Sequence, residues 1–582
     1  MPAKPFTDTE IPVTEGVVRV LQDAGVDTVF GLSGGDTGRI FSRLAHHTST
    51  VRTVLVRNEA HSTSAAEAYA RASGKIGVAM GQGAWVLGQG LVGILEAQAS
   101  GTPMLLLVDL TDGGHYSQHA PYQAGTADYN TWDARSAFAA VTKRVFVART
   151  PAEAVQSVQF AIKHAEAGQP GPVAVLFGSS SLAGTVGPES VPRLYGTRHY
   201  LSDPKEALPD MSAVAEALIS ASSPVIVAGG GVRLSGAETL VKQLAEATGA
   251  AVVTSPAGKG TFPEDHPNAA GVFGNFGWPL ANDTIASADL LLVLGSKLGP
   301  SDTANEHIGL FDPAKQRIIQ VDVEPLNVSW TMPTDEVVVA DISAGLVDLL
   351  QRLAVTAPSG EVVAERVSRL DRARARFAED AAHSASESSP IHPQRVIAEL
   401  RSALPDDAIV CTDAGENRLL MGRYFVSREG GSYLQPAGAG GMGYGIPAAV
   451  GAKAFAPDRV VAAVCGDGGF SMSLPALLTA AEENLPIIVL VLDNGILGWV
   501  RHSQRMRGEL EFNSDLRRFD YAGIGEASGF VAHRVATPEQ LREALTEAVA
   551  SGLPSLIVAE TSTEQTFVDL RTPLLAPAPA RD

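Results

Sequence analysis

The sequence contains very little cysteine, with only Cys411 and Cys465 among its 582 residues. Each of the two stands in an apolar stretch that is typical of a β-strand. In such a context a small buried thiol is the common case, and a disulfide or a metal-binding pair is the rare one. We therefore predict two buried free thiols.

Long apolar runs and clusters of basic residues are also missing. No stretch of about 18 or more uninterrupted apolar residues occurs, and residues 1–10 are polar, so the sequence predicts neither a membrane span nor a secretory signal. The formal net charge is −20, from 44 Lys and Arg against 64 Asp and Glu, and no basic run offsets it. This balance argues against nucleic acid as a partner. We expect a cytoplasmic protein without a membrane or nucleic-acid partner.

What the sequence does contain is a regular alternation of strand-like and helix-like runs. An apolar content of 45% and a charged content of 19% describe an ordinary globular protein. The alternation predicts βαβ units and parallel sheets that are buried on both faces. The strand-like runs are residues 28–31, 51–56, 76–80, 104–108, 173–176, 225–228, 251–254, 290–294, 317–321, 409–412, 459–464 and 486–492.

Two stretches interrupt this alternation and are interpreted as interdomain linkers. They are residues 191–204 and the charged, Ser-rich residues 354–390. A chain of this length holds about three domains. We predict three doubly wound α/β domains with parallel sheets, at 1–190, 205–355 and 385–565.

The segment Cys465-Gly-Asp-Gly-Gly-Phe470 carries the clearest chemical signal. Most Gly-Asp-Gly tripeptides are ordinary turns. This one follows a predicted strand and precedes a predicted helix and a second strand, and Asn494 stands just after that second strand. Asp467 and Asn494 offer hard oxygen ligands, and the carbonyl of Ile496 offers a third, which is the ligand chemistry of Mg²⁺. A diphosphate can approach the bare backbone of three glycines and the following helix N-terminus. These glycines are Gly466, Gly468 and Gly469.

This segment resembles the thiamine diphosphate motif of the acetolactate synthase and pyruvate oxidase superfamily. The resemblance extends from about residue 11 to residue 561. It implies three α/β domains, in the order pyrimidine-binding, central and diphosphate-binding, with thiamine diphosphate and Mg²⁺ as cofactors. It also implies a homodimer or homotetramer whose active sites are shared between chains.

Glu59 stands between the strand-like run 51–56 and a helical run, 60–72. A carboxylate there is most often a charge at a helix N-terminus. The resemblance implies a catalytic role instead, in which Glu59 exchanges a proton with N1′ of the cofactor's aminopyrimidine. The match continues through Ala66-Glu-Ala-Tyr-Ala-Arg71.

A glycine-dense loop, 438–447, contains Gly440 and Met442. Met442 fits either a core methionine in a flexible turn or, by resemblance, the residue that lies beneath the cofactor and bends it. Gly415 and Glu416 resemble the other half of the diphosphate cradle.

The loop 109–129 is expected to contact the substrate. By resemblance, Gln123 corresponds to a residue that orients the bound reactant in acetolactate synthases. His115 and His119 have no counterpart in the family; they are interpreted either as solvated loop residues or as an acid and a base. A Zn²⁺ site would need a third ligand. Asp36, where the family has a small residue, would repel a 2-oxo acid unless it is paired.

The resemblance favours an acetolactate synthase-like carboligase that acts on a 2-oxo acid or a related carbonyl compound. Because residues 80–85 and the positions of Trp499 and Ser503 depart from the synthases, a C–C lyase or hydrolase acting on a 1,2-dione or a 2-hydroxyacyl-CoA is the alternative. A cofactor-binding protein without turnover is a third reading. The central turn 228–232 lacks the full dinucleotide fingerprint. By resemblance, synthases that retain FAD carry an Arg-Phe-Asp-Asp-Arg run where this chain reads Lys297-Leu-Gly-Pro-Ser-Asp302, which argues against FAD and leaves FAD or an adenine nucleotide as an open alternative.

Overall fold

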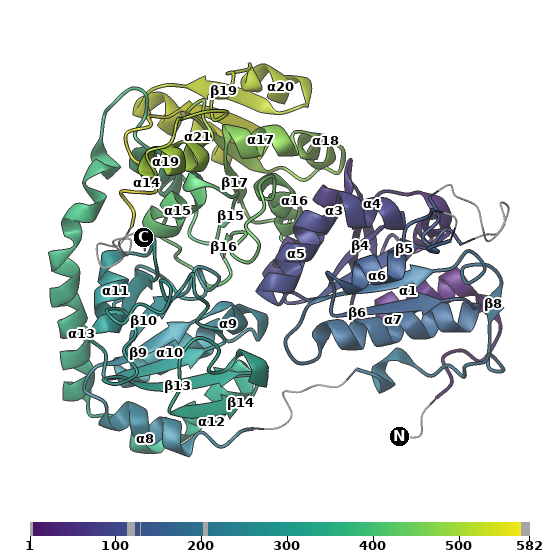
Figure 1. The fold of residues 1–582 in the computed structure, drawn as a ribbon, viewed down its shortest axis with the longest axis horizontal. Helices are drawn as coiled ribbons and strands as arrows, with labels where there is room; N and C mark the ends of the chain where they lie inside the picture. The colour runs from purple at the N-terminus through teal and green to yellow at the C-terminus, as the bar shows by residue number, and fades with distance from the viewer. Residues whose placement is uncertain (1–3, 113–122, 129, 202–207, 572–582) are drawn as a thin grey trace. The chain divides into compact units, whose positions relative to one another are not determined.

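The computed structural model describes residues 4–112, 123–128, 130–201 and 208–571, and three six-stranded sheets dominate it (Figure 1). Every neighbouring pair of strands in these sheets is parallel. Helices flank the sheets, so the predicted α/β class with three doubly wound parallel sheets is confirmed. A short antiparallel pair, β1 (Ile11–Pro12) and β8 (Thr185–Val186), lies outside them.

The chain divides into two compact units. The N-terminal unit comprises residues 1–203, 438–457 and 473–485, and the C-terminal unit comprises residues 204–437, 458–472 and 486–582. This division does not test the three predicted domain boundaries, which stay predictions.

The first strand of the N-terminal unit's sheet is an inner strand, next to one edge strand, and the sheet grows from it toward both edges, which is the doubly wound pattern. Figure 1 shows α3 on one side of this sheet and α7 on the other. The strands in sheet order are β3 (Arg52–Leu55), β2 (Thr28–Gly31), β4 (Gly77–Gly81), β5 (Met104–Asp109), β7 (Pro172–Phe177) and β6 (Arg144–Ala148). The helices of this unit are α1 (Val13–Asp23), α2 (Gly38–Leu44), α3 (Glu59–Ser73), α4 (Gly83–Gly88), α5 (Leu91–Ser100), α6 (Ala134–Ala139), α7 (Pro151–Glu166), α16 (Gly445–Phe455) and α18 (Pro475–Glu482).

The C-terminal unit holds the two other sheets. The central sheet has the order β11 (Ala269–Val272), β10 (Ala251–Thr254), β9 (Pro224–Ala228), β12 (Leu290–Leu294), β13 (Arg317–Asp322) and β14 (Glu336–Val339). Its helices are α8 (Ser212–Ser220), α9 (Gly230–Leu234), α10 (Glu238–Thr248), α11 (Pro279–Ala286), α12 (Ile342–Thr356) and α13 (Gly360–Arg376).

The last sheet has the order β16 (Tyr433–Leu434), β15 (Ile409–Thr412), β17 (Val461–Gly466), β18 (Ile488–Asp493), β20 (Ser555–Glu560) and β19 (Val531–Val535). Its helices are α14 (Pro393–Ala403), α15 (Glu416–Tyr424), α17 (Asp467–Ser473), α19 (Gly498–Met506), α20 (Tyr521–Ala527) and α21 (Pro538–Ser551). Apolar strands fill the interior of each sheet, and Cys411 and Cys465 lie there as buried free thiols, as predicted.

The structure adds local detail to two sequence-based interpretations. The stretch 354–390, interpreted as a linker, contains the 17-residue helix α13, which Figure 1 shows as one long helix. Tertiary contacts explain the difference, because Arg366 of α13 is buried and donates hydrogen bonds to the carbonyls of Leu218 (3.1 Å) and Thr248 (2.6 Å) at the ends of α8 and α10. In the Gly-Asp-Gly segment α17 begins directly at Asp467, so the segment passes from β17 into a helix without an intervening loop.

Within the residues that the structure describes, no helix combines the length and the apolar character that crossing a membrane requires.

Candidate functional site

The polar residues of the N-terminal unit gather at one edge of its sheet. Glu59 follows β3, Asp36 follows β2, Gln82 follows β4, and Asp109 is the last residue of β5. These four strands are neighbours in the sheet, and the carboxyl ends of parallel strands meet at the same edge. The sheet topology therefore brings residues that are up to 73 positions apart to one place.

Glu59 is the first residue of α3, whose start is fixed by Asn58. The Asn58 side chain accepts a hydrogen bond from the Ala60 amide at 2.8 Å, as an N-cap does. Glu59 is only 5% exposed, and none of the described residues hydrogen-bonds to its carboxylate. A buried carboxylate without a partner is costly, which makes this position suited to a ligand that supplies a hydrogen-bonding nitrogen.

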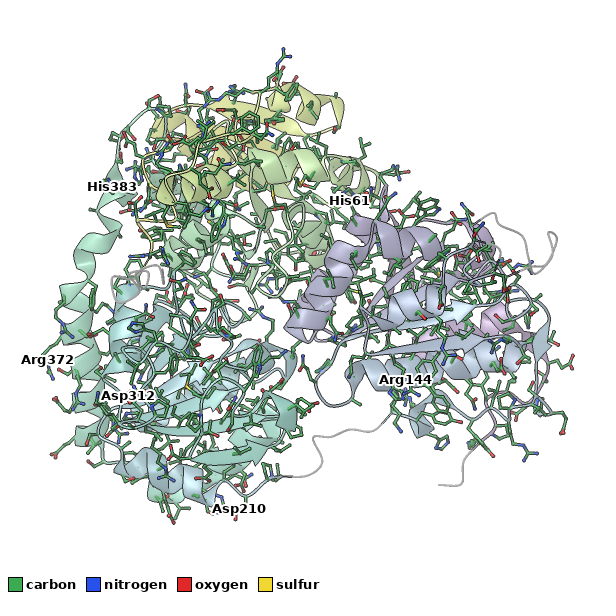
Figure 2. All side chains as sticks on the ribbon, in the orientation of Figure 1. His61, Arg144, Asp210, Asp312, Arg372 and His383 are labelled. Carbon is green, nitrogen blue, oxygen red and sulfur yellow. The ribbon has the colours of Figure 1, made fainter. Side chains whose placement is uncertain are left out.

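His61, labelled on α3 in Figure 2, is buried two residues further along, and its Nδ1 has no hydrogen-bond partner among the described residues. Burial lowers the pKa of His61 to about 4, because the charged imidazolium loses its hydration. His61 is therefore neutral at physiological pH. Sequence reasoning did not single it out, since a helical histidine has no distinctive spacing.

The substrate side of this sheet edge is organised by Asp109. Its buried carboxylate accepts hydrogen bonds from the amides of Gly83 (2.9 Å) and Asp36 (3.0 Å), and burial raises its pKa. A Cβ on Gly35 would lie 1.7 Å from Asp109 Oδ2, so the turn after β2 requires glycine. Sequence reasoning placed Asp36 near the substrate but did not identify Asp109 as the residue that holds this turn.

The structure describes some of the residues that were predicted to contact the substrate. Gln123 Oε1 accepts a hydrogen bond from Gln82 Nε2 at 3.1 Å, so Gln82 is a second amide at the same edge. Asp36 forms an ion pair with Arg39 at 3.5 Å, which offsets the repulsion expected for an anionic substrate. His115 and His119 lie outside the described residues.

The loop that carries Gly440 and Met442 belongs to the same compact unit as Glu59. The loop leads into α16, which packs on α3 so closely that a Cβ on Gly451 would lie 2.1 Å from the carbonyl oxygen of Ala65. Two predicted cofactor-binding features, Glu59 and the loop with Met442, are thus assembled in one unit although they are distant in sequence.

The predicted diphosphate and metal site lies at the carboxyl ends of β17 and β18, which are neighbours. Asp467 is 3% exposed and accepts hydrogen bonds from the amides of Gly468 (2.9 Å) and Gly495 (2.7 Å). Asn494 Oδ1 accepts from the Ile496 amide at 3.2 Å, which places both predicted side-chain ligands and the third residue in one short turn. Burial, together with the neighbouring Asp493, raises the pKa of Asp467 to about 6.

This donor set fits a hard divalent cation. Asp493 already pairs with Arg534 at 3.2 Å, so Asp467 is the carboxylate that a bound cation would neutralise. Among the described residues, no cluster of three or more His, Cys, Asp or Glu side chains could hold a metal. The predicted site differs from such a cluster, because one carboxylate, one amide and one main-chain carbonyl leave the remaining positions for phosphate and water, as Mg²⁺ prefers.

The glycines around Asp467 have two different surroundings. A Cβ on Gly466 would meet nothing within 4 Å, so the space beside it is open to a ligand. A Cβ on Gly469 would lie 2.7 Å from Asp413 Oδ1, so this glycine is required by the protein itself. Gly415 has a φ of 96°, a conformation that favours glycine and turns the chain into α15.

Glu416 is engaged by the protein. Its Oε1 pairs with His502 Nδ1 at 2.7 Å and accepts a hydrogen bond from the Phe567 amide at 3.0 Å. The carboxylate is thus held away from free solvent, and a contact with a diphosphate would come from the backbone at the start of α15. Sequence reasoning missed His502, whose only signal is its place eight residues after Asn494.

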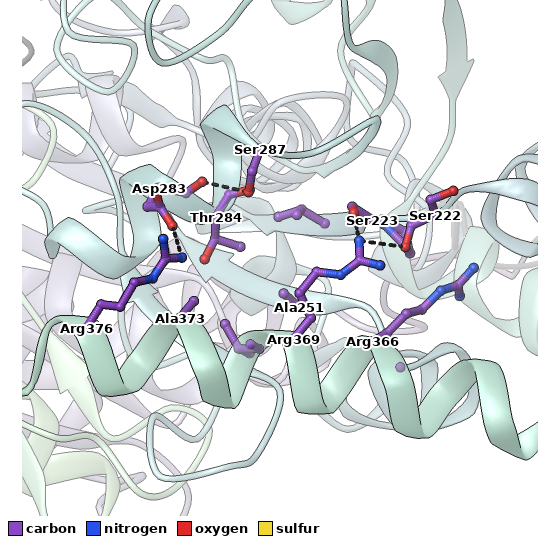
Figure 3. Close-up of a pocket in the computed structure, with 14 residues that line it drawn as sticks. Ser222, Ser223, Ala251, Asp283, Thr284, Ser287, Arg366, Arg369, Ala373 and Arg376 are labelled. Atoms are coloured by element: carbon purple, nitrogen blue, oxygen red, sulfur yellow. Dashed lines mark hydrogen bonds and ion pairs between the residues drawn. The ribbon is translucent and has the colours of Figure 1, made fainter.

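The central sheet carries the glycine-rich turn 228–232, for which FAD or an adenine nucleotide was left as an open alternative. A Cβ on Gly229 would lie 2.2 Å from the carbonyl oxygen of Gly295, and one on Gly231 would lie 2.7 Å from Gly295 Cα. The glycines of this turn are thus explained by two strand-end loops packing against each other. A cavity of ≈260 Å³ lies at the opposite edge, where β9, β10 and β12 begin, and α13 lines it with Arg366, Arg369 and Arg376 (Figure 3). That edge is not the one at which doubly wound sheets bind nucleotides.

Comparison with known families covers most of the chain. Three family models match: "Thiamine pyrophosphate enzyme, N-terminal TPP binding domain" at residues 11–129, "Thiamine pyrophosphate enzyme, central domain" at residues 211–351, and "Thiamine pyrophosphate enzyme, C-terminal TPP binding domain" at residues 413–559. Each match contains one of the three sheets in whole or in large part.

Curated relatives align over almost the full length. A probable acetolactate synthase large subunit of Methanocaldococcus jannaschii is 30% identical over 557 residues, which covers 93% of this chain and 90% of the relative. The acetolactate synthase isozyme 3 large subunit of Escherichia coli is 30% identical and is covered to 92%, as is this chain. A putative thiamine pyrophosphate-containing protein of Bacillus subtilis is 27% identical, with coverages of 93% and 90%.

Proposed function

Because the chain belongs to the acetolactate synthase family of thiamine pyrophosphate enzymes, we propose that it joins carbon atoms of 2-oxo acids in a reaction that requires thiamine diphosphate and Mg²⁺. The observation that carries this proposal is the buried Asp467, set beside Asn494 and a backbone that is open at Gly466. These residues have the donor chemistry for Mg²⁺ and a diphosphate.

The chain's residues divide the work. When bound, thiamine diphosphate supplies a nucleophilic carbon that adds to a carbonyl group. Asp467, Asn494 and the Ile496 carbonyl would hold the metal, and the backbone of the Gly-Asp-Gly segment would hold the diphosphate. Glu59 would hold a proton at N1′ of the aminopyrimidine, and its unpartnered, buried carboxylate supports this role.

The residues on the substrate side of the N-terminal sheet support a small anionic substrate. Asp109 holds the turn after β2, the amides of Gln82 and Gln123 offer hydrogen bonds, and Asp36 is already paired with Arg39. A 2-oxo acid could therefore approach this edge without facing an uncompensated carboxylate.

One observation favours the alternative, a C–C lyase or hydrolase that acts on a 1,2-dione. Trp499 stacks on Phe567 with ring centroids 4.5 Å apart, and Phe276 packs against both rings, at 5.7 Å and 6.1 Å. This aromatic cluster suits a bulkier, less polar substrate than pyruvate.

The deciding experiment is a substrate panel. The purified chain, with thiamine diphosphate and Mg²⁺, is offered pyruvate, a cyclic 1,2-dione and a 2-hydroxyacyl-CoA in parallel. We expect acetolactate from pyruvate, and the loss of all product when Mg²⁺ is removed by a chelator. Turnover of the dione alone would select the alternative, and mass spectrometry of released ligands would show whether FAD or an adenine nucleotide is bound.

Glu59→Gln separates catalysis from cofactor binding. The amide cannot exchange a proton with N1′, so the variant should bind thiamine diphosphate but slow the exchange of its C2 proton, followed by NMR. An unchanged exchange rate would mean that Glu59 acts only as a favourable charge at the N-terminus of α3. If the parent chain binds the cofactor but shows neither exchange of the C2 proton nor turnover, the third alternative, a cofactor-binding protein without turnover, would be favoured.

We also propose a homodimer or homotetramer in which each active site combines Glu59 of one chain with Asp467 of another. Mixing Glu59→Gln chains with Asp467→Ala chains tests this, because a mixed dimer would then regain one intact site. Restored activity supports shared sites, and a mixture as inactive as its components contradicts them.

A further inference from the structure

The loop before Met442 is fastened to helix α5 by a single buried carboxylate. Glu96 Oε1 accepts a hydrogen bond from the Gly438 amide at 2.8 Å, and its Oε2 accepts from the amides of Ala439 (2.7 Å) and Gly440 (3.2 Å). Glu96 is 1% exposed. Three successive backbone donors aimed at one carboxylate make a charge-assisted anchor.

A second carboxylate holds the other end of the same loop. The Tyr444 hydroxyl donates to Glu67 Oε2 at 2.5 Å, and Thr102 donates to Glu67 Oε1 at 2.8 Å. Glu67 lies on α3, two turns after Glu59. Met442 therefore stands between two anchored ends, one held by α5 and one held by α3.

The two carboxylates share one cation. Arg71 Nη1 lies 3.6 Å from Glu67 and 4.0 Å from Glu96, and all three side chains are buried. A buried carboxylate is costly unless it is paired and hydrogen-bonded, and both conditions are met here. Removing one partner would leave the others uncompensated.

The packing of this loop against α5 also explains why the loop contains glycine. A Cβ on Gly438 would lie 2.8 Å from Ala99 Cβ, and one on Gly441 would lie 2.8 Å from Val92 Cγ2. Both neighbours belong to α5. The loop is thus pressed against the helix, and its glycines are needed by the protein before any ligand arrives.

We propose that Glu96, with Glu67, is a positioning residue that fixes the Met442 loop in the conformation that receives the cofactor. The proposal rests on the proposed function for the role of Met442. It assigns to α5 a task that the sequence motifs of the cofactor site do not contain, which is to pre-form one wall of that site.

The test compares Glu96→Gln with Gln98→Ala, an exposed residue on the same helix. Hydrogen exchange of the peptide 438–444 should rise about tenfold or more in Glu96→Gln and stay at the parent rate in Gln98→Ala. The dissociation constant of thiamine diphosphate, measured by calorimetry with Mg²⁺, should rise about 10-fold to 100-fold, as for other outer-shell partners. Unchanged loop exchange or unchanged affinity would overturn the proposal.

A double-mutant cycle with Met442→Ala shows whether Glu96 acts through Met442. If it does, Glu96→Gln should weaken binding much less in the Met442→Ala background than in the parent. Equal losses in both backgrounds would mean that Glu96 only stabilises the fold, and would overturn the proposal. A parent chain that does not bind the cofactor would instead refute the proposed function, and the exchange measurement would still decide whether Glu96 holds the loop.

Discussion

Two glycine-rich segments of this chain look alike in sequence and differ in what surrounds them. The loop 438–441 is closed on protein atoms, with three amides bound by Glu96 and side chains of α5 against Gly438 and Gly441. At the segment 466–469, Gly466 faces open space and Asp467 lies near a second carboxylate.

The difference teaches that a glycine can be required by a neighbour or by a ligand, and that sequence does not distinguish the two. The first loop is complete without cofactor, because its donors and charges are paired within the protein. In the second segment Asp493 pairs with Arg534 at 3.2 Å, whereas the buried carboxylate of Asp467 receives only two backbone amides. Asp467 therefore has the chemistry that suits a bound cation.

Asp467→Ala should have the largest effect on this comparison. Loss of a metal ligand costs more than loss of an outer-shell partner, so affinity for thiamine diphosphate with Mg²⁺ should fall by at least about 100-fold. Calorimetry measures it, and Asp458→Ala, an exposed carboxylate ahead of β17, is the matched control. Full cofactor occupancy of Asp467→Ala after gel filtration would refute the metal assignment.

Gly438→Ala and Gly466→Ala test the comparison itself. The methyl group at position 438 would press on Ala99 and on the backbone of Ser100, which should lower the free energy of unfolding by about 1–3 kcal/mol. The methyl group at position 466 meets open space, so stability should stay at the parent value while cofactor affinity falls. Thermal unfolding and calorimetry on both variants decide it, and the reverse pattern would contradict the distinction.

His61 should make the stability of the N-terminal unit depend on pH. Its pKa is lowered to about 4 in the folded protein, so only the unfolded chain takes up a proton as the pH falls below about 6.5. The contribution of neutral His61 to the free energy of unfolding is therefore present above about pH 6.5 and is lost as the pH falls toward 4. At pH 5 the free energy of unfolding should be about 2 kcal/mol lower than at pH 7.

Hydrogen exchange of α3 at the two pH values measures this loss. His61→Gln should remove most of the difference, and His46→Gln, at an exposed histidine of the same unit, should leave it in place. An equal acid-side loss in the parent and in His61→Gln would show that other groups dominate.

Asn58→Ala should have the smallest effect. Removal of the N-cap that precedes Glu59 should cost about 1 kcal/mol and loosen the first turn of α3. Asn58→Asp keeps an acceptor for the Ala60 amide and should retain most of the stability. The cap would be irrelevant if both variants melted at the parent temperature.

Much of the fold was predictable because parallel strands are short, apolar and bounded by turns. The expected runs 28–31, 104–108 and 290–294 coincide with β2, β5 and β12 almost residue for residue. Helix α13 was missed because few of its residues are apolar and buried, and because its buried Arg366 is satisfied by carbonyls at the ends of other helices. Composition alone cannot reveal such partners.

The candidate site was predictable to the extent that its chemistry is local. Asp467, Asn494 and Ile496 lie around one strand pair, so their spacing along the chain already indicated that they come together. Asp109, Glu96 and His502 were missed because their partners are distant in sequence: Asp36, the loop 438–440 and Glu416.

The sequence by itself determined which residues carry hard oxygen atoms, where strands end and where glycine is used. Only the tertiary structure decided which glycines are closed by protein and which are open, and which carboxylates are paired. The physical reason is that burial and hydrogen bonding depend on neighbours that the folded chain brings from far away, whereas strand formation depends on neighbours along the chain.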